Sequence, residues 1–420
     1  MTEKSVTVFI YLPWETVAVP AGIFTHTAES GIGTFAYGRR YIERSNALPV
    51  DPVALPIDLP PQPVTINGGL YGTFRDAAPD YWGRLVISVG MGAPPEAVSE
   101  VDYLLAANAT RAGNLDFRIS PQVPEPGLKP PHFSRLPDIM DAAGKLESGG
   151  KVDRHLFQLL RQGTSMGGAR PKCTVEWEDG LWLAKFPAKG DGLNIPRIEY
   201  ATMTLARRCG IRIPEVRVVS VGDKDVFLIR RFDREKSGDA WLRKGFLSAL
   251  SLMQWDERDR VLWDYPAIAD TMRRHIAAED IRELFRRMIF NILVRNTDDH
   301  PRNHGFLIDN SKISLSPAYD IVPTPARAGV GTDFHLAMSV GDYGRQATLK
   351  NALSRASRFG ISDEEAWDMA EQLRTTVCDW REHFEAYMVS VRDSDMLTPC
   401  FDGLRTGNWK LETENLKLDT

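Results

Sequence analysis

The residues best suited to chemistry lie in one short stretch, NTDDHPRNHGF, which runs from 296 to 306 behind the apolar run LFRRMIFNILV. Within it Asp298 and Asn303 stand five positions apart, and another aspartate, Asp320, follows in SPAYDIVPT. Phosphoryl transfer from ATP needs a carboxylate that accepts a hydroxyl proton, with an amide and a second carboxylate that hold Mg²⁺ between the phosphates. Because Mg²⁺ prefers hard oxygen ligands and keeps several waters, one Asn and one Asp suffice. The spacing therefore indicates a site for phosphoryl transfer.

Other parts of such a site precede this loop. Lys185 ends an apolar strand in LWLAKFPAKG, where it could pair with phosphates, and the following helix offers Glu199 to orient it. Upstream, GTSMGGARPK (163–172) is a Gly-rich turn whose successive backbone N–H groups could cradle a phosphate, with Arg170 and Lys172 adding charge. These parts occur in the order that a bilobed kinase requires.

The 296–306 loop has two other interpretations. Asp298 and Asn303 would also suit a loop that caps a helix and satisfies its own backbone groups. His300 and His304, taken with Asp298 and Asp299, would suggest a zinc or two-metal hydrolase, although the D-D-H run lacks the two-helix ligand spacing that such sites favour. We expect His300 to form a hydrogen bond within the loop instead.

The remaining candidates also have structural interpretations. Lys185 would then be a surface lysine, Glu199 a solvated helix residue, and 163–172 a simple turn. An ion-pair cluster is as good an explanation of RRFDR (230–234) as a ligand contact. Five tryptophans are expected in the core: Trp82, Trp177, Trp182, Trp367 and Trp380.

Three regions of the chain differ in texture, which predicts a strand-rich N-terminal subdomain (1–125), a small α/β nucleotide-binding lobe (150–245) and a helical C-terminal catalytic lobe (246–420). VTVFIYL predicts a first strand. In the middle region, 174–187 predicts two strands joined by an Asp179-Gly180 turn, and 216–232 predicts a second hairpin with its turn at Gly222-Asp223. Between them, 196–211 predicts a helix that Gly210 ends.

Helical periodicity dominates the last third of the chain. The run 278–294 places apolar residues on one face at i, i+3, i+4 and i+7 spacing. Ser362 and Glu365 form a capping-box pattern before a second amphipathic run, and the polar tail ETENLKLDT is expected to fray. The apolar positions of the second run are Trp367, Ala370, Leu373, Val377, Trp380 and Phe384.

Composition excludes several classes of protein. The 420 residues carry a formal net charge of −5, which argues against a large nucleic-acid footprint on this chain itself. The four cysteines lie far apart, as in a protein of the reducing cytosol with neither a disulfide framework nor a zinc cluster. No apolar run approaches the roughly 20 residues that cross a bilayer. We expect a cytoplasmic protein that makes no membrane contact.

With these motifs the chain resembles the HipA-type serine/threonine kinases, the toxins of bacterial toxin–antitoxin modules. The matching segments are FAYGRRYIERSNALPVDP, GTFRDAAPDYWGRLV, TSMGGARPK, LAKFP, IEYATMTLARRCGI, RRFDR, NTDDHPRNHGF and LSPAYDI. The resemblance implies an α+β, bilobed protein-kinase-like fold with a strand-rich N-terminal part and an α-helical C-terminal lobe.

The resemblance also implies roles for single residues. Asp298 would be the catalytic base, Asn303 and Asp320 the Mg²⁺ ligands, and Glu199 a support for the phosphate-binding lysine. Ser165 would be the regulatory autophosphorylation site. The implied nucleotide-binding residues are Gly167, Gly168, Ala169, Arg170, Pro171, Lys172, Lys185, Arg230, Arg231, Phe232, His300, Asn303 and Tyr319. Many family members carry an acidic residue where Arg230 stands, so a hinge contact there would come from backbone atoms.

The implied reaction is ATP- and Mg²⁺-dependent phosphorylation of a translation component, such as glutamyl-tRNA synthetase. The implied partner is a HipB-like helix-turn-helix antitoxin, through which the chain would reach DNA indirectly. Two other functions stay open: a catalytically silent, ATP-binding regulator and a metal-dependent phosphohydrolase.

Overall fold

The computed structural model describes residues 3–58, 60–124, 130–163, 168–274, 276–325 and 334–401. The chain divides into two compact units. The N-terminal unit comprises Met1–Gly190, Val219–Glu257 and Phe306–Ile313, and the C-terminal unit comprises Asp191–Val218, Arg258–Gly305 and Ser314–Thr420. The predicted boundaries at 125, 150 and 245 stay a prediction.

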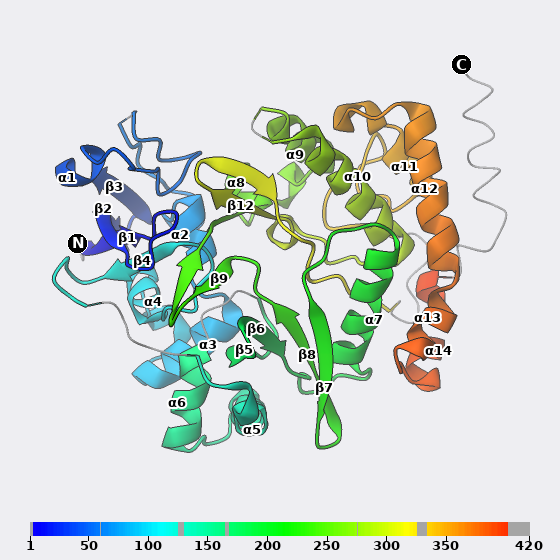
Figure 1. Ribbon diagram of the computed structural model, residues 1–420, viewed down its shortest axis with the longest axis horizontal. Helices are drawn as coiled ribbons and strands as arrows, with labels where there is room; N and C mark the ends of the chain where they lie inside the picture. The colour runs from blue at the N-terminus through cyan, green and yellow to red at the C-terminus, as the bar shows by residue number, and fades with distance from the viewer. Residues whose placement is uncertain are drawn as a thin grey trace. The chain divides into compact units, whose positions relative to one another are not determined.

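The N-terminal unit begins with a four-stranded antiparallel sheet in the order β3-β2-β1-β4 (Figure 1). Its first strand lies where VTVFIYL predicts one, and the alternate residues Val6, Val8 and Ile10 enter a core that also contains Phe74 and Phe117. The strands are β1 (Glu3–Ile10), β2 (Val19–Thr27), β3 (Ile32–Tyr37) and β4 (Leu115–Arg118). The helices around them are α1 (Arg39–Ile42), α2 (Gly72–Ala77), α3 (Tyr81–Met91) and α4 (Glu100–Ala106), with a 3-10 turn η1 (Pro95–Ala97).

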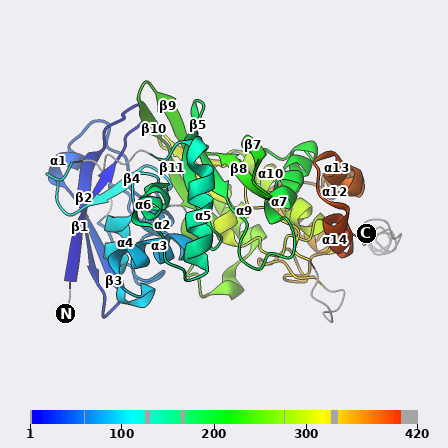
Figure 2. The same ribbon diagram turned by 90° about the horizontal axis from the view of Figure 1, so that it is seen from below.

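A second antiparallel sheet has the order β5-β6-β8-β7, and α5 and α6 pack against one of its faces (Figure 2). The β7–β8 turn is Gly222-Asp223, as predicted. The β5–β6 turn lies one residue earlier than predicted, at Glu178-Asp179, because Trp177 pairs with Gly180 and Glu178 adopts the left-handed φ of +54°. The strands are β5 (Lys172–Trp177), β6 (Gly180–Lys185), β7 (Val216–Val221) and β8 (Lys224–Arg230). The helices are α5 (Leu136–Glu147), which follows the 3-10 turn η2 (Phe133–Arg135), and α6 (Arg154–Gly163).

Two smaller sheets follow, one of order β10-β9 and one of order β11-β12-β13. Their strands are β9 (Arg234–Ser237), β10 (Ala240–Arg243), β11 (Gly245–Ser248), β12 (Gly305–Asp309) and β13 (Lys312–Leu315). The short helix α8 (Ala249–Leu252) follows β11. Its N-cap is Ser248, whose side chain accepts from the Ser251 N–H.

The described part of the C-terminal unit is mainly helical (Figure 1). Its central helix, α10, buries all six residues of the predicted apolar face: Ile281, Leu284, Phe285, Met288, Ile292 and Leu293. The helices are α7 (Ile195–Arg208), α9 (Tyr265–Met272), α10 (Ala278–Leu293), α11 (Leu349–Leu353), α12 (Asp363–Cys378), α13 (Trp380–Ala386) and α14 (Val391–Phe401). The 3-10 turns are η3 (Arg260–Leu262), η4 (Pro301–Asn303) and η5 (Ala356–Phe359).

The capping residues in the sequence predict two helix ends correctly, but the apolar periodicity does not reveal a break between two helices. Gly210, at φ +75°, follows the C-cap of α7 as predicted, and the Ser362–Glu365 capping box begins α12. The predicted run from Trp367 to Phe384 is two helices, because α12 ends at Cys378 and α13 starts at Trp380. The apolar spacing continues across the break, so the periodicity alone cannot reveal it.

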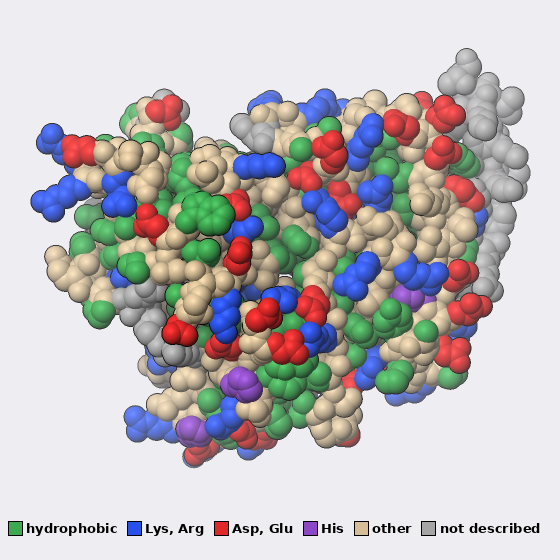
Figure 3. Space-filling view, in the orientation of Figure 1, with side chains coloured by type: hydrophobic (Ala, Val, Ile, Leu, Met, Phe, Trp, Pro, Cys, Tyr) green, Lys and Arg blue, Asp and Glu red, His purple; other side chains and the backbone are tan. Residues whose placement is uncertain are grey.

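The distribution of charged side chains and tryptophans can be compared with the predictions from composition. Figure 3 shows acidic and basic side chains interspersed over one face of the protein. In the part of the chain that the structure describes, no helix is long and apolar enough to cross a membrane. Trp82, Trp182 and Trp380 are buried as predicted, whereas Trp177 and Trp367 are only half-buried. The predicted fraying of the tail falls outside the described residues.

Candidate catalytic and nucleotide-binding residues

The predicted catalytic loop leaves the C-terminal end of α10 and closes on itself. The side-chain amide of Asn303 donates to the Asp298 carbonyl at 2.8 Å, and the Asn303 N–H donates to the His300 carbonyl at 2.8 Å. These two bonds fix Asn303 beside Asp298, and they leave the Asn303 amide oxygen as the side-chain atom that can accept a cation. The D-x-x-x-x-N spacing thus becomes a short, self-braced turn.

Asp320 lies close to this loop within the same unit. The Tyr319 hydroxyl donates to the Arg302 carbonyl at 2.8 Å, which ties the Asp320 segment to the loop. The pKa of Asp298 is raised, first by partial removal of its carboxylate from water and also by repulsion from Asp320, against an opposing effect of His300. Asn303 and Asp320 line one small pocket. Asp320 itself adopts a left-handed φ of +61°, a conformation that is uncommon for non-glycine residues and that aspartate tolerates better than most.

These residues fit a magnesium ion. Asn303 and Asp320 offer an amide oxygen and a carboxylate, both hard donors, and a dication there would relieve the repulsion between Asp298 and Asp320. Among the described residues, no three His, Cys, Asp or Glu side chains lie close enough to hold a metal. The zinc or two-metal interpretation of the D-D-H run therefore gains no support.

A buried polar network lies beneath the loop, and sequence reasoning missed it. The Tyr265 hydroxyl donates to the Asp299 carboxylate at 2.7 Å, and the Asn291 side chain donates to the same hydroxyl at 3.1 Å. The other carboxylate oxygen of Asp299 accepts the Ala337 N–H at 2.7 Å. Burial raises the pKa of Asp299 to about 7. The network joins α9, α10, the loop and the segment around 337, and the doubled aspartate of NTDDH was its only sequence signal.

The two histidines of the loop have different surroundings. His304 is buried within hydrogen-bond distance of the Tyr265 hydroxyl (3.1 Å), and burial lowers its pKa to about 3, which keeps it neutral at neutral pH. The loop bond expected from His300 comes from its carbonyl, since its ring Nδ1 is buried without a hydrogen-bond partner in the described structure. The expected hydrogen bond of His300 within the loop is therefore present, and it is made by the main chain.

The predicted phosphate-binding lysines lie in the N-terminal unit. Lys172 and Lys185 are direct partners across β5 and β6, so their side chains share one face of the sheet. Both are buried, at 5% and 7% exposure, which rules out an ordinary surface lysine at 185. On the same face, the Thr174 hydroxyl is buried with no hydrogen-bond partner in the described structure. Two ammonium groups and a hydroxyl on one face suit an anionic, oxygen-rich ligand.

The end of the Gly-rich loop is held by α3. The Asp80 carboxylate accepts the Gly168 N–H at 2.7 Å, and the Gly168 carbonyl accepts the Trp82 N–H at 3.3 Å. The Trp82 indole donates to the Lys172 carbonyl at 3.0 Å. Arg75 holds Asp80 in turn, at 2.9 Å. We call Asp80, Trp82 and Arg75 the α3 clamp. In the sequence these residues stand out only as parts of the motif GTFRDAAPDYWGRLV.

The predicted hinge is partly a structural ion-pair cluster. Arg231 and Arg234 both pair with Asp233, at 2.7 and 2.8 Å, and all three are buried. Arg231 also donates to the carbonyls of Thr110 and Arg111, and its N–H donates to Leu181. The Arg231 side chain is thus committed to the core, so the predicted nucleotide contact of this residue would have to come from its backbone. Arg230 is half-exposed and pairs with Asp179 at 3.2 Å, and Phe232 is half-buried.

The other predicted positions are distributed as follows. Ser165 and Gly167 lie outside the described residues. Ala169 is exposed, Arg170 is half-buried, and Pro171 is buried with its carbonyl accepting the Phe186 N–H at 3.0 Å. Glu199 is buried in α7 of the C-terminal unit, which rules out a solvated helix residue. Its pairing with Lys185 and the functional roles of the site residues stay predictions.

Comparisons with known proteins agree on one family. The model of the HipA-like C-terminal domain matches residues 164–380. Among curated proteins, "Putative kinase Y4dM" of Sinorhizobium fredii is 28% identical over 36% of this chain and 39% of its own length, so the chain spans only part of that relative. "Putative kinase Y4mE" of the same organism is 24% identical over 76% of this chain and 78% of its own.

A solved structure extends the agreement to the fold. A chain from the Shewanella oneidensis MR-1 complex of HipA, HipB and operator DNA matches 95% of this chain and 95% of its own length, with a TM-score of 0.66 and 15% identity. The α+β, HipA-like kinase fold expected from the sequence is confirmed. Because the family model covers more than half of the 420 residues, the chain belongs to the HipA-like C-terminal domain family.

Proposed function

We propose that this protein is a serine/threonine protein kinase that transfers the γ-phosphate of ATP to a hydroxyl group. The observation that carries the proposal is the geometry of the loop. Asp298 is held beside Asn303 by the loop's own hydrogen bonds, and Asp320 is near enough to raise its pKa. A base poised beside two metal-ligand oxygens is the minimal apparatus for phosphoryl transfer. Mg²⁺, when bound, neutralises charge on the phosphates.

Each group of residues has a distinct task in this proposal. Asp298 accepts the proton of the attacking hydroxyl, and Asn303 keeps its position fixed relative to that base. Lys172 and Lys185 supply positive charge toward the phosphates, and the α3 clamp holds the backbone of Gly168 where it can approach them. Positioning and charge neutralisation then supply most of the rate acceleration.

The biological role follows by analogy with the family. The Shewanella complex contains HipB and operator DNA, so we propose a HipB-like helix-turn-helix antitoxin as the partner of this chain, with DNA contacted through that partner. The net charge of −5 suits a protein that does not bind DNA by itself. The proposed target of the toxin is a translation component such as glutamyl-tRNA synthetase.

Regulation by autophosphorylation at Ser165 is part of the same proposal. A phosphoserine adds about −1.5 to −2 charge at neutral pH, which would repel the phosphates of ATP. Ser165→Asp should therefore weaken ATP binding, and Ser165→Ala should not, as measured by titration calorimetry. Equal ATP affinity of the two variants would remove Ser165 from the proposal.

Label transfer from γ-labelled ATP tests the proposed activity. Wild type with Mg²⁺ should incorporate label into itself or into added protein, and Asp298→Asn should lose about 10²–10⁴-fold of this rate while still binding ATP. Asp368→Asn, an exposed aspartate on α12, is the matched control and should behave as wild type. Equal rates in wild type and Asp298→Asn would refute the assignment of the base. ATP binding by wild type without any transfer would favour a silent regulator.

A further inference from the structure

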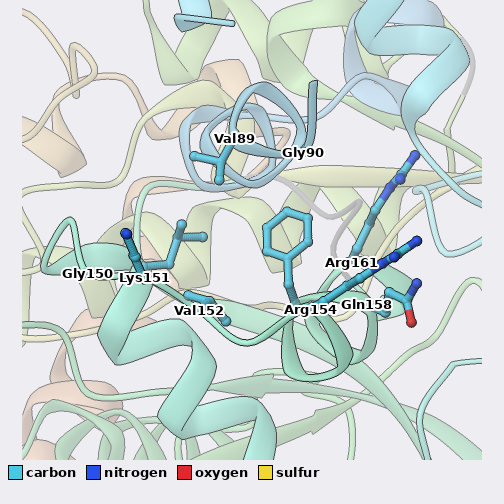
Figure 4. Close-up of a pocket in the computed structure, with 10 residues that line it drawn as sticks. Val89, Gly90, Gly150, Lys151, Val152, Arg154, Gln158 and Arg161 are labelled. Carbon is cyan, nitrogen blue, oxygen red and sulfur yellow. The ribbon is translucent and has the colours of Figure 1, made fainter. Parts of the chain in front are cut away.

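A hollow of about 670 Å³ lies on the N-terminal unit, beside α3, the end of α5 and α6. Its apolar lining comes from Val89, Leu146, Val152 and Phe157. Figure 4 shows Val89 and Gly90 on one side of the hollow and residues of α6 on another. A Cβ atom at Gly90 would come within 3.2 Å of the Phe157 ring, so the missing side chain lets this ring pack close to α3.

Positive charge surrounds the hollow. Lys151, Arg154 and Arg161 line it, and all three side chains are exposed. Arg154 and Arg161 are seven residues apart on α6 and therefore share one face of the helix. Among the described residues, none of the three forms an ion pair or a side-chain hydrogen bond. The chain as a whole is acidic, so this concentration of positive charge is local.

Nearby acidic groups are engaged elsewhere. Asp153 accepts the N–H of His155 at 2.8 Å, and Glu147 accepts the N–H of Lys189 at 2.7 Å. On the adjacent helix α5, by contrast, Lys145 pairs with Asp141 at 2.6 Å. Surface cations of this unit can thus find partners within the chain, and those around the hollow have none in the described structure. Their charges are therefore open to acidic groups of another molecule.

We propose that this hollow is a docking site for a protein segment in which an apolar side chain is flanked by acidic residues. The apolar side chain would cover Val89, Val152 and Phe157, and its acidic neighbours would meet the cations of α6. Such a central apolar contact with a charged rim is the usual anatomy of a protein interface. A nucleic acid suits the hollow less well, because single-stranded binding relies on aromatic faces for base stacking and Phe157 is only half-exposed beneath Gly90.

The proposed site is adjacent in sequence to the Gly-rich segment. The chain runs directly from the end of α6 at Gly163 into 164–172, the Gly-rich segment. A partner docked on α6 would bind the helix that leads into this segment. The docking proposal concerns recognition alone and stands whether or not the protein transfers phosphate.

Peptide selection on the full chain tests the proposal. A display library of random short peptides is selected on immobilised wild type and, separately, on Arg154→Glu/Arg161→Glu. Wild type should enrich peptides with an apolar residue between acidic ones. A synthetic peptide from that set, followed by fluorescence anisotropy, should bind the double variant at least about tenfold more weakly, with affinity for wild type falling as salt rises.

Two further variants keep the test decisive. Arg40→Glu/Lys224→Glu reverses two exposed charges of the same unit outside the hollow and should bind as wild type. Val89→Glu, at a side chain that is 49% exposed, should weaken binding even if the double variant folds poorly. Enrichment of the same peptides by wild type and the double variant, or no enrichment, overturns the proposal. Preferential binding of an oligonucleotide to the hollow would also overturn the proposal. So would a wild-type dimer, seen by light scattering, that Arg154→Glu/Arg161→Glu dissociates and the control variant does not.

Discussion

The predicted catalytic loop (296–306) and the Gly-rich loop are held in place in different ways. The catalytic loop is braced by bonds between near neighbours in sequence, such as Asn303 to Asp298, and it rests on a fully buried polar network around Asp299. The described end of the Gly-rich loop, Gly168, is held from outside by Asp80, 88 positions earlier in the chain. The first loop is thus anchored to the core through Asp299, whereas the second depends on a few contacts that single substitutions can remove.

The two loops also differ in the free energy needed to break the contacts that hold them. Buried polar networks are costly to break because each group left without a partner keeps its full desolvation penalty. The α3 clamp is less buried: the Asp80 side chain is 12% exposed, and Glu257, which pairs with Arg75 at 2.8 Å, is 34% exposed. We therefore expect the catalytic loop to be rigid, and the end of the Gly-rich loop to be adjustable at low cost.

The largest expected effect is a loss of phosphoryl-transfer rate on substitution of the proposed metal ligand Asp320. Asp320→Asn should lower phosphoryl transfer by at least about 10²-fold and raise the Mg²⁺ concentration needed, because an amide attracts a dication less strongly than a carboxylate. Asn tolerates the left-handed φ of +61°, so the fold should be kept. Initial rates across a magnesium titration check this, and thermal unfolding is the control. An unchanged magnesium requirement would remove Asp320 from the metal site.

The next effect concerns the buried network and has a definite sign. The folded-state pKa of Asp299, about 7, lies above its unfolded value of about 3.9, so the folded protein holds a proton that the unfolded chain releases. The free energy of unfolding should therefore fall as pH rises from about 4 to about 7, by on the order of a few kcal/mol. Asp299→Asn cannot titrate, so the wild-type minus variant difference should show this slope in urea unfolding. A flat difference would mean that Asp299 ionises normally.

A smaller effect is expected at the α3 clamp. Asp80→Ala removes the acceptor for the Gly168 N–H and the partner of Arg75, so KM for ATP should rise about tenfold with little change in kcat. Asp80→Asn keeps one acceptor and should lie between Ala and wild type. Asp141→Asn, at an exposed ion pair on α5, is the matched control. If kcat and kcat/KM fell by the same factor, Asp80 would instead contribute to stabilising the transition state of phosphoryl transfer.

The smallest effect is expected at the hinge. Arg230→Ala removes a partly exposed ion pair with Asp179, which is worth about 0–1 kcal/mol, and should change KM for ATP by less than about threefold. A larger rise in KM would show that its guanidinium contacts the nucleotide, in contrast to the core-bound Arg231.

How much the sequence predicts depends on the range of the interaction. The β7–β8 turn, the Gly210 helix end and the Ser362–Glu365 capping box were correct because each depends on residues within a few positions. The break between α12 and α13 was missed because apolar spacing continues through it. Asp80 was missed because its partner is Gly168, and no local pattern connects positions so far apart.

The sequence by itself determined the inventory: a loop with Asp298 and Asn303 behind an apolar helix, a strand ending in Lys185, and the order that resembles one kinase family. Tertiary structure alone decided which polar groups are buried together. In the folded protein Arg231 is buried in an ion-pair cluster, Asp299 accepts a hydrogen bond from Tyr265, and Lys172 pairs with Lys185 across two strands. Motifs record the residue types that chemistry needs, whereas burial and pairing arise only when segments distant along the chain come to share one low-dielectric interior.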